Sequence, residues 1–198
     1  MAWSPDYVTT SDLADYLRIG DSVDDALLAI AVTAASRAVD RHTNRQFGAV
    51  AAAEERRYTA RRDHCRRRYV IEMDDVMDDT GLTITTEAGT IDVYALQPSN
   101  AAEVGEPWTR IVVDPDSAVQ PTLTEDAVTI EAPWGWTAVP TAVEQATLIQ
   151  AARFFTRRNA PFGIAGSPDS GSEMRLLSKV DADVAVALGR YIRWWAAV

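Results

Sequence analysis

The sequence predicts an α+β protein: an antiparallel helical bundle of about four helices with a β-rich insertion between the second and third long helical segments. Two observations predict this class. Residues 1–49 and 139–198 show the spacing of apolar residues that is typical of helices, whereas residues 50–138 contain short β-rich runs separated by turn residues. We therefore expect one structural domain with an insertion. Residues 1–49 form an N-terminal helix pair, and residues 139–198 supply a central helix, a flexible loop and a C-terminal helix that complete the bundle.

The central helix is expected from about Pro140 to Arg158. Thr141 and Glu144 have the spacing of a capping box at its start, and Pro161 disfavours helix in the residue before it. Its apolar residues point in several directions, so we expect the helix to be buried on more than one side.

The N-terminal pair begins with a short helix that is capped by Thr9 and Asp12 and stopped near Gly20. Ser22 and Asp25 are expected to open a second helix, which continues to about Thr43. The second helix carries an apolar stripe of Val23, Leu27, Ile30, Ala31, Ala34 and Ala38, widened by Leu28, Ala35 and Val39. Its many alanines would let another helix approach closely.

Six β-rich runs are expected within residues 50–138, at spacings that favour a small antiparallel sheet or sandwich. They are residues 56–60, 68–73, 82–86, 91–96, 109–113 and 127–134. The chain returns to the helices at Trp134-Gly135-Trp136.

The end of the chain combines a loop rich in Gly, Pro and Ser at 159–172 with a final helix from about Asp181 to Trp195. Loops of this length in a compact domain are usually functional or disordered. Large aromatic side chains on a terminal helix more often anchor an interface than fill a core, so we expect Trp194 and Trp195 to contact a partner.

The overall charge and composition exclude several classes of protein. The net charge of −10 argues against a protein that coats DNA, because such binding depends on cations that neutralise phosphates. No apolar run is long enough for a transmembrane helix, and the N-terminus lacks the features of a secretory signal. A single cysteine, Cys65, fits assembly in a reducing cytoplasm.

Motifs for catalysis are absent from the sequence: it has no GxSxG, Walker A, HExxH or paired CxxC motif. The best candidate for a metal site is the acidic run EMDDVMDD, with Asp74, Asp75, Asp78 and Asp79. It lacks the ligand spacing and the glycine of a calcium loop, so a solvated acidic turn is favoured. We expect no cofactor, no metal and no enzymatic activity.

A basic cluster interrupts this acidic chain at residues 56–68, where seven arginines accompany one aspartate. The cluster could contact phosphate or an acidic protein partner, since arginine suits both, or it could form a strand whose arginines pair with nearby acidic residues. A protein partner is favoured over DNA because the rest of the chain is acidic. The possible contact residues are Arg56, Arg57, Arg61, Arg62, Arg66, Arg67 and Arg68.

Three segments in this order resemble the head-to-tail adaptor (head–tail connector) proteins of long-tailed bacteriophages, of the type found in phages of actinobacteria. They are YVTTSDLADYLRIGDSVDDALLAIAVTAASRAVDRHTNRQF, VTIEAPWGWTAVPTAVEQATLIQAARFFTRR and VDADVAVALGRYIR. Together they span roughly half of the chain, and it is their order that carries the resemblance.

The resemblance implies a non-enzymatic structural protein of the virion neck, made in the host cytoplasm. Such a protein forms a ring, usually of twelve copies, which connects the portal to the stopper or tail-completion proteins and lines the DNA channel. On this reading DNA passes without specific binding, and no membrane is involved. We expect the portal contact at Tyr191, Arg193, Trp194 and Trp195, and contacts between subunits at Phe162, Gly163 and Ile164.

Two other classes stay open at this point. A nucleic-acid-binding accessory protein would use the cluster from Arg56 to Arg68. A metal-dependent enzyme would use the acidic run together with His64. The sequence contains no positive motif for either.

Overall fold

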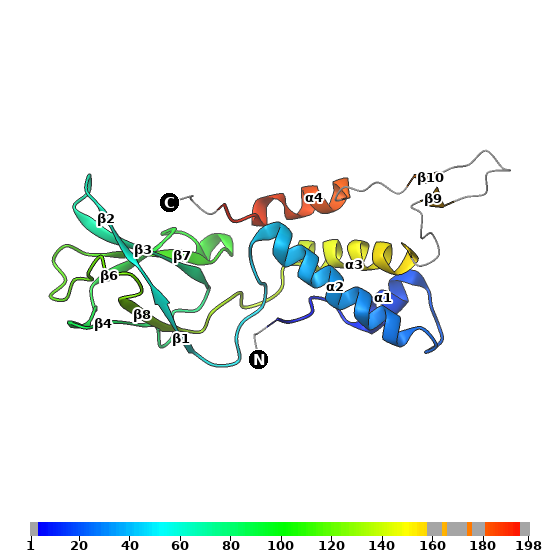
Figure 1. The fold of residues 1–198 in the computed structure, drawn as a ribbon, viewed down its shortest axis with the longest axis horizontal. Helices are drawn as coiled ribbons and strands as arrows, with labels where there is room; N and C mark the ends of the chain where they lie inside the picture. Colours follow the sequence, from blue (N-terminus) through cyan, green and yellow to red (C-terminus); the bar gives the residue numbers. More distant parts are fainter. Residues whose placement is uncertain (1–3, 158–163, 166–173, 176–180, 195–198) are drawn as a thin grey trace. The chain divides into compact units, whose positions relative to one another are not determined.

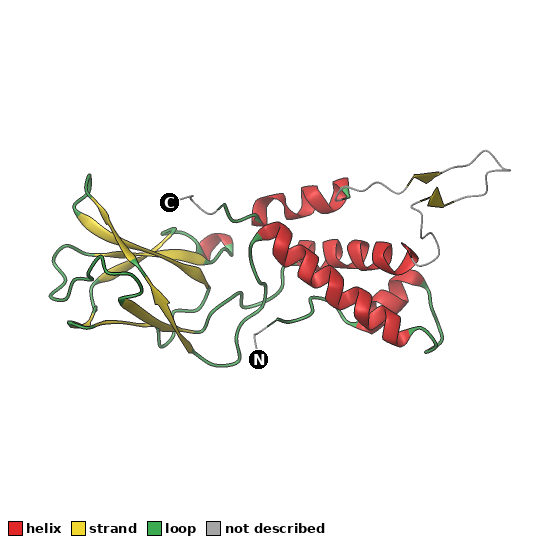
Figure 2. Ribbon diagram, in the orientation of Figure 1, coloured by secondary structure: helices red, strands yellow, loops and turns green. Residues whose placement is uncertain are grey.

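The computed structural model describes residues 4–157, 164–165, 174–175 and 181–194. The chain divides into two compact units. The helical unit consists of Met1–Phe47 and Val139–Val198, and the β unit is Gly48–Ala138. Figure 1 shows the path of the chain, and Figure 2 colours the helices and strands.

The predicted architecture, a helical bundle with a β-rich insertion, is wrong. The described residues form four α-helices and two antiparallel four-stranded sheets, which is a mixed α+β fold. The reason is that the strands pair into sheets that bury apolar residues of their own. Ile71, Ile84, Ile111 and Ile130, one from each of four strands, have no exposed surface. The β unit therefore has its own buried side chains.

Four α-helices make up the described part of the helical unit. They are α1 (Thr10–Leu17), α2 (Asp25–Thr43), α3 (Thr141–Thr156) and α4 (Ala182–Leu188), and α4 continues into a 3₁₀ turn, η4 (Gly189–Tyr191). Helix α3 packs against α1, α2 and α4. The prediction that this helix is buried on more than one side is confirmed (Figure 1).

The predicted starts of α1, of α3 near Pro140 and of α4 near Asp181 are confirmed, whereas a predicted capping box forms only at α1. There the Asp12 N–H donates to Thr9 Oγ1 over 3.1 Å and the Thr9 N–H donates to Asp12 Oδ2 over 2.8 Å, so the predicted capping box is confirmed. The helix ends at Leu17, as expected, and Arg18 is its C-cap in the left-handed conformation (φ 58°). The expected caps of the other two long helices are wrong, because Asp24 and Pro140 hold the N-cap positions and neither makes a side-chain capping bond.

Only some residues of the apolar stripe expected on the second helix are buried. The buried face of α2 uses Leu28, Ala31, Val32, Ala35 and Val39. Leu28, Val32 and Ala35 pack with Leu13 of α1 and Ala151 of α3. Of the other stripe residues, Val23, Leu27, Ile30 and Ala34 are exposed and Ala38 is half-buried; Val23 precedes the first residue of α2. The helix is apolar in two neighbouring arcs, and the helical unit covers only one of them.

The segment before α1 is fastened along α2 by hydrogen bonds. The Tyr7 N–H donates to Ser36 Oγ over 3.2 Å, and the Tyr7 hydroxyl donates to Asp40. The Phe47 N–H in turn donates to the Tyr7 hydroxyl over 3.0 Å. Burial raises the pKa of both Tyr7 and Asp40. These groups serve to close the fold around the end of α2.

Eight strands form the two sheets of the β unit (Figure 2). One sheet has the order β1 (Glu54–Tyr58), β8 (Val128–Ala132), β4 (Thr83–Thr86) and β5 (Gly89–Thr90). The other has the order β2 (Ala60–Asp63), β3 (Arg68–Val76), β7 (Trp108–Val113) and β6 (Tyr94–Gln97). Each of the six predicted runs overlaps a strand, and the run 56–60 covers most of β1 and the first residue of β2; β5 and the rest of β2 were not predicted.

The two ends of the β unit are paired with each other. The Val50 N–H donates to the Trp134 carbonyl over 2.9 Å, and the Trp136 N–H donates to the Gly48 carbonyl over 3.0 Å. Gly135 lies between them at φ 107°, and a Cβ at this position would stand 2.1 Å from the Gly48 carbonyl oxygen. We call this pairing of Gly48–Val50 with Trp134–Trp136 the clasp. It fixes where the chain enters and leaves the β unit.

Candidate interaction surfaces

Two of the residues expected at the portal contact, Tyr191 and Arg193, make contacts within the helical unit. The ring of Tyr191 meets that of Phe47 edge to face, with centroids 5.7 Å apart. The Arg193 N–H donates to the Thr43 carbonyl over 2.8 Å, and the Asn44 side-chain amide donates to the Arg193 carbonyl over 3.2 Å. These contacts tie the segment after α4 to the end of α2.

Trp194 directly follows this tied segment, and its side chain is 85% exposed. A tryptophan held next to a fixed backbone while its ring lies in solvent is typical of an interface anchor. Trp195 lies outside the described residues. The final helix is shorter than predicted, because α4 ends at Leu188 and the backbone is already extended at Ile192.

Of the residues expected at contacts between subunits, Phe162 and Gly163 lie outside the described residues. Ile164 belongs to the short strand β9 (Ile164–Ala165), which pairs antiparallel with β10 (Met174–Arg175). The bounds of the predicted loop at 159–172 therefore include one strand of a hairpin.

The arginine cluster extends over β1, which lies in one sheet, and over β2 and the turn into β3, which lie in the other. We call residues 56–68 the arginine hairpin, after the β2–β3 hairpin that they include. Arg56 contributes to the fold, since its guanidinium lies 2.8 Å from Asp74 Oδ2 and 4.8 Å from the centre of the Trp134 ring. Arg68 and Arg66 pair with Asp63 at 3.6 and 4.0 Å.

The other four arginines of the hairpin present their charge to solvent. Arg57, Arg61, Arg62 and Arg67 are all exposed, and the described residues offer none of them an ion pair. Arg62 only stacks over the Tyr69 ring, at 5.8 Å. Both readings of the cluster thus apply to different members: Arg56 is structural, while these four are exposed and have no ion pair among the described residues.

The aspartates of the acidic run make hydrogen bonds to different parts of the β unit. Asp74 accepts hydrogen bonds from Arg56 and from the Tyr58 hydroxyl, the latter over 2.9 Å. Asp75 is buried and accepts a hydrogen bond from the indole N–H of Trp136 over 2.9 Å. Asp78 caps a turn by accepting from the Thr80 N–H, and its hydrogen bonds with Thr80 lower its pKa. Within the described ranges, no group of three His, Cys, Asp or Glu side chains could hold a metal ion.

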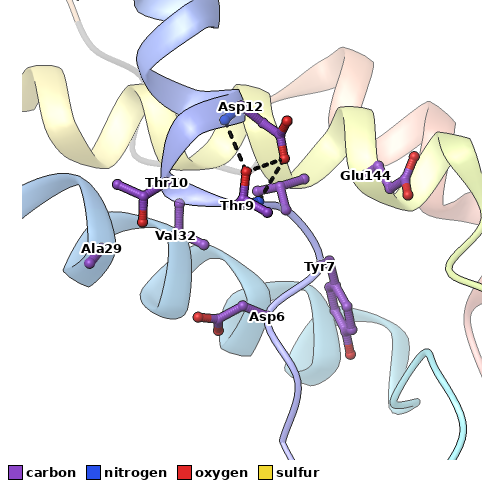
Figure 3. A pocket seen from close by; sticks show the side chains of 9 residues that line it. Asp6, Tyr7, Thr9, Thr10, Asp12, Ala29, Val32 and Glu144 are labelled. Carbon is purple, nitrogen blue, oxygen red and sulfur yellow. Dashed lines mark hydrogen bonds between the residues drawn. The ribbon is translucent and has the colours of Figure 1, made fainter. Parts of the chain in front are cut away.

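A cavity of about 510 Å³ lies in the helical unit beside the start of α1 (Figure 3). Carboxylates of Asp6, Asp12 and Glu144 contribute to its lining, and Val8 and Val32 supply apolar surface. Asp12 is occupied by the capping box, and Asp6 accepts a hydrogen bond from the Thr33 hydroxyl over 2.9 Å. The described lining contains no histidine, cysteine or basic residue.

The surface that the sequence did not predict is the exposed stripe of Leu27, Ile30 and Ala34 on α2, with the exposed Val23 just before the helix. Val23 is 85% exposed and Ile30 is 65% exposed. The signal was present in the sequence, since the helix has more apolar positions than one buried face can use. Among the described residues, no helix is both long and apolar enough to cross a membrane.

Comparison with known proteins gives a likeness of fold. No family model matches the chain, and no curated protein matches it. A solved structure described as the neck of a native GTA particle, computed with C12 symmetry, contains a chain that is 19% identical, with a TM-score of 0.55. The match covers 100% of this chain and 95% of the other.

Two further solved structures with chains of similar extent are the virion of a native gene transfer agent (GTA) particle and the neck of an empty GTA particle computed with C6 symmetry. Their TM-scores are 0.49 and 0.44, with identities of 19% and 16%, and each match covers 100% of this chain and 95% of the other. The likeness of fold is therefore taken from the first structure, whose TM-score is 0.55. The whole chain, both units included, has the fold of a chain found in the neck of a gene transfer agent particle.

Proposed function

We propose that this protein is a structural component of the neck of a phage-like particle. In this role it forms a ring that connects the portal to the stopper or tail-completion proteins and lines the channel for DNA. The observation that carries the proposal is the likeness, over the full length of the chain, to a chain in a neck with C12 symmetry. The order of the three sequence segments, found without the structure, supports the same role.

The chemistry of the described residues supports a structural role. The polar clusters serve the fold: Asp74 and Asp75 hold Arg56 and Trp136, and Tyr7 and Asp40 fasten the N-terminal segment. A net charge of −10 suits a channel wall along which DNA must slide without sticking, because like charges repel.

Within this role we assign the portal contact to the segment after α4. Tyr191 and Arg193 position the segment against α2, and Trp194 offers an exposed ring to the partner. The arginine hairpin offers a basic surface for an acidic neighbour in the neck. We assign the loop at 159–172, which includes Phe162, Gly163 and Ile164, to contacts between subunits.

The test is assembly with the portal protein of the same particle. The purified chain, a monomer of 21.7 kDa, is measured by light scattering and negative-stain microscopy, alone and with portal. We expect rings, or a monomer that shifts onto the portal when the two are mixed. A stable small oligomer that ignores the portal would contradict the proposal.

One observation favours a second candidate, a nucleic-acid-binding accessory protein: the four exposed arginines of the hairpin. That function requires binding to DNA that weakens steeply with salt. Retention on a DNA column at low salt, abolished by replacing Arg57, Arg61, Arg62 and Arg67, would favour it over the neck role.

A further inference from the structure

We infer that the β2–β3 turn of one copy of the chain packs, head to tail, against an acidic end at the opposite edge of the same sheet in a neighbouring copy. This rests on the proposed ring, and it names the acidic neighbour of the arginine hairpin. The occupant is a second copy because each copy carries both ends, which are opposite in charge and stand at one level of the sheet.

The basic end lies where the β2–β3 hairpin turns. Residues 61–68 contain five arginines and one aspartate. Arg62 and Arg67 are exposed and have no ion pair among the described residues, and the side chain of Arg66 is 70% exposed. The turn therefore presents positive charge that its own surroundings do not neutralise.

The acidic end lies where β6 begins and β7 ends. The Asp114 N–H donates to the Val93 carbonyl over 3.1 Å, which joins the two strands next to Asp92. The Asp116 N–H donates to Asp114 Oδ1 over 2.8 Å, so a third carboxylate follows directly. All three aspartates are exposed.

The charge of the acidic end is not neutralised within the β unit. Residues 69–138 contain fourteen acidic residues and one arginine, Arg110, which pairs with Glu72 at 3.3 Å. Burial and then the charge of Asp79 raise the pKa of Tyr94, the first residue of β6, so Asp79 lies near this end as well. Among the described residues, no ion pair is made by Asp79, Asp92, Asp114 or Asp116.

The two ends stand at the same level of one sheet, on its opposite edges. Strand β2 is one edge and β6 is the other, about 14 Å apart at the usual spacing of strands. One row of paired residues crosses all four strands: Arg62, Tyr69, Val113 and Tyr94. The β2–β3 turn lies beyond this row, and Asp92 and Asp114 lie beyond it at the same end of the sheet.

This placement suits a contact that repeats around a ring. Copies that stand side by side, with their strands in the same direction, bring the basic end of one to the acidic end of the next. A ring of identical copies needs two different faces on each copy, and the two edges of the sheet supply them. Charge also disfavours the arrangements in which like ends meet.

The natural cysteine tests this inference in the full chain, because Cys65 is exposed in the β2–β3 turn. We add one thiol at the acidic end with Asp92→Cys. The control is Val104→Cys, a 60% exposed position in the 3₁₀ turn that follows the other end of β6. The unmodified chain and the Cys65→Ser/Asp92→Cys protein complete the set. Each protein is concentrated, with and without the portal, and treated with a bis-maleimide shorter than the width of the sheet, so that it bridges thiols of different copies.

We expect a ladder of dimers, trimers and larger products only from the Asp92→Cys protein that keeps Cys65. Products that stop at dimers, or dimers from the unmodified chain, would show a two-fold contact and overturn the inference. It would also be overturned if Asp92→Cys gave no ladder in either condition, or if Val104→Cys gave an equal one.

An exchange of charge separates this inference from the proposed function. Arg62→Glu with Arg67→Glu should keep the circular dichroism of the folded chain but lose ring formation on the portal. Adding Asp92→Arg and Asp116→Arg to that protein exchanges the two ends and should restore the rings, and a failure to restore them would overturn the inference. If the unmodified chain forms rings and the glutamate variant forms them equally well, the inference fails and the neck role stands. If the unmodified chain neither forms rings nor binds the portal, the neck role fails and the inference with it.

Discussion

Gly135 is the residue at which the backbone leaves least room for change. Its φ of 107° lies where side chains are rarely tolerated, and an added Cβ would collide with the Gly48 carbonyl of the clasp. We expect Gly135→Ala to lower the free energy of unfolding by about 1–3 kcal/mol from the backbone conformation alone, and by more because the clasp must open. Urea unfolding measures this.

The matched control is Gly20→Ala. At Gly20 an added Cβ would meet nothing within 4 Å. We expect its free energy of unfolding to stay within about 1 kcal/mol of the natural protein. Equal free energies of unfolding for the two variants would show that the clasp can accommodate a Cβ at Gly135.

Trp194 is the residue on which the portal contact should depend. Trp194→Ala removes a large exposed ring without touching the bonds of Tyr191 and Arg193, so the fold should persist while co-sedimentation with the portal falls at least tenfold. Tyr16→Ala is the control, since that ring is 53% exposed on α1. Unchanged co-sedimentation of the Trp194→Ala protein would contradict the assignment.

At the scale of the element, the cap of α1 is the clearest case of a sequence signal that carries stability. Thr9→Ala removes the hydroxyl that accepts from the Asp12 N–H and should cost about 1 kcal/mol. Ser11→Ala changes an exposed hydroxyl of the same turn and should cost little. Thermal unfolding compares the two, and equal losses would contradict the role of the cap.

The cap also has a dependence on pH with a definite sign. Hydrogen bonds from the hydroxyl and then from the N–H of Thr9 lower the pKa of Asp12 below its ordinary value. A carboxyl whose pKa falls on folding stabilises the protein above its unfolded pKa, and this contribution is lost as the pH falls through the folded pKa. The difference between the natural protein and Thr9→Ala should therefore shrink below about pH 4.

The arginine hairpin should act as a unit. Replacing Arg57, Arg61, Arg62 and Arg67 by glutamine removes four charges that have no ion pair within the described residues, so the thermal midpoint should barely change. Binding to an assembled neck, measured at rising salt, should weaken and lose most of its salt dependence. Glutamine at Arg56 is the contrasting change. It breaks the contact with Asp74 and should destabilise the β unit.

Some of the elements could be predicted from the sequence and others could not. The cap of α1 was predictable because Thr9 and Asp12 interact within one turn. The buried face of α2 was not, because its leucines, isoleucine and alanines lie on two neighbouring arcs and periodicity alone does not say which arc meets α3. Strand β2 was missed because Arg61 and Arg62 are exposed, which leaves Ala60 as its only buried residue.

On the scale of the whole molecule, turn residues in the sequence indicated where the strands lie, but they did not predict which strands pair with each other. Strand β1 pairs with β8 some seventy residues away, as Tyr58 faces Val128, and such long-range choices depend on the packing of the complete sheet. The expectation of a bundle with a small insertion failed for the same reason. The spacing of the β-rich runs was compatible with one antiparallel sheet or with a sandwich, and no local pattern decided between one sheet and two.

The separate buried side chains of the β unit lead to a prediction about the whole chain. A fragment of residues 48–138 should fold alone and unfold in one cooperative transition, because its sheets and its clasp are complete within it. Circular dichroism and urea unfolding test this. A fragment carrying Gly135→Ala serves as the comparison, and a natural fragment that shows no cooperative transition would contradict the prediction.

The clasp has a consequence for the history of such proteins. Because the two strands of chain that enter and leave the β unit are paired at Ala49 and Gly135, a recombination event that exchanges everything between them would leave the flanking helices joined over the same short gap. Lineages could thus acquire a different β unit while keeping the helices and the segment after α4 that, in our proposal, contacts the portal. The position of the clasp marks the breakpoints at which shuffling of this kind would be inherited.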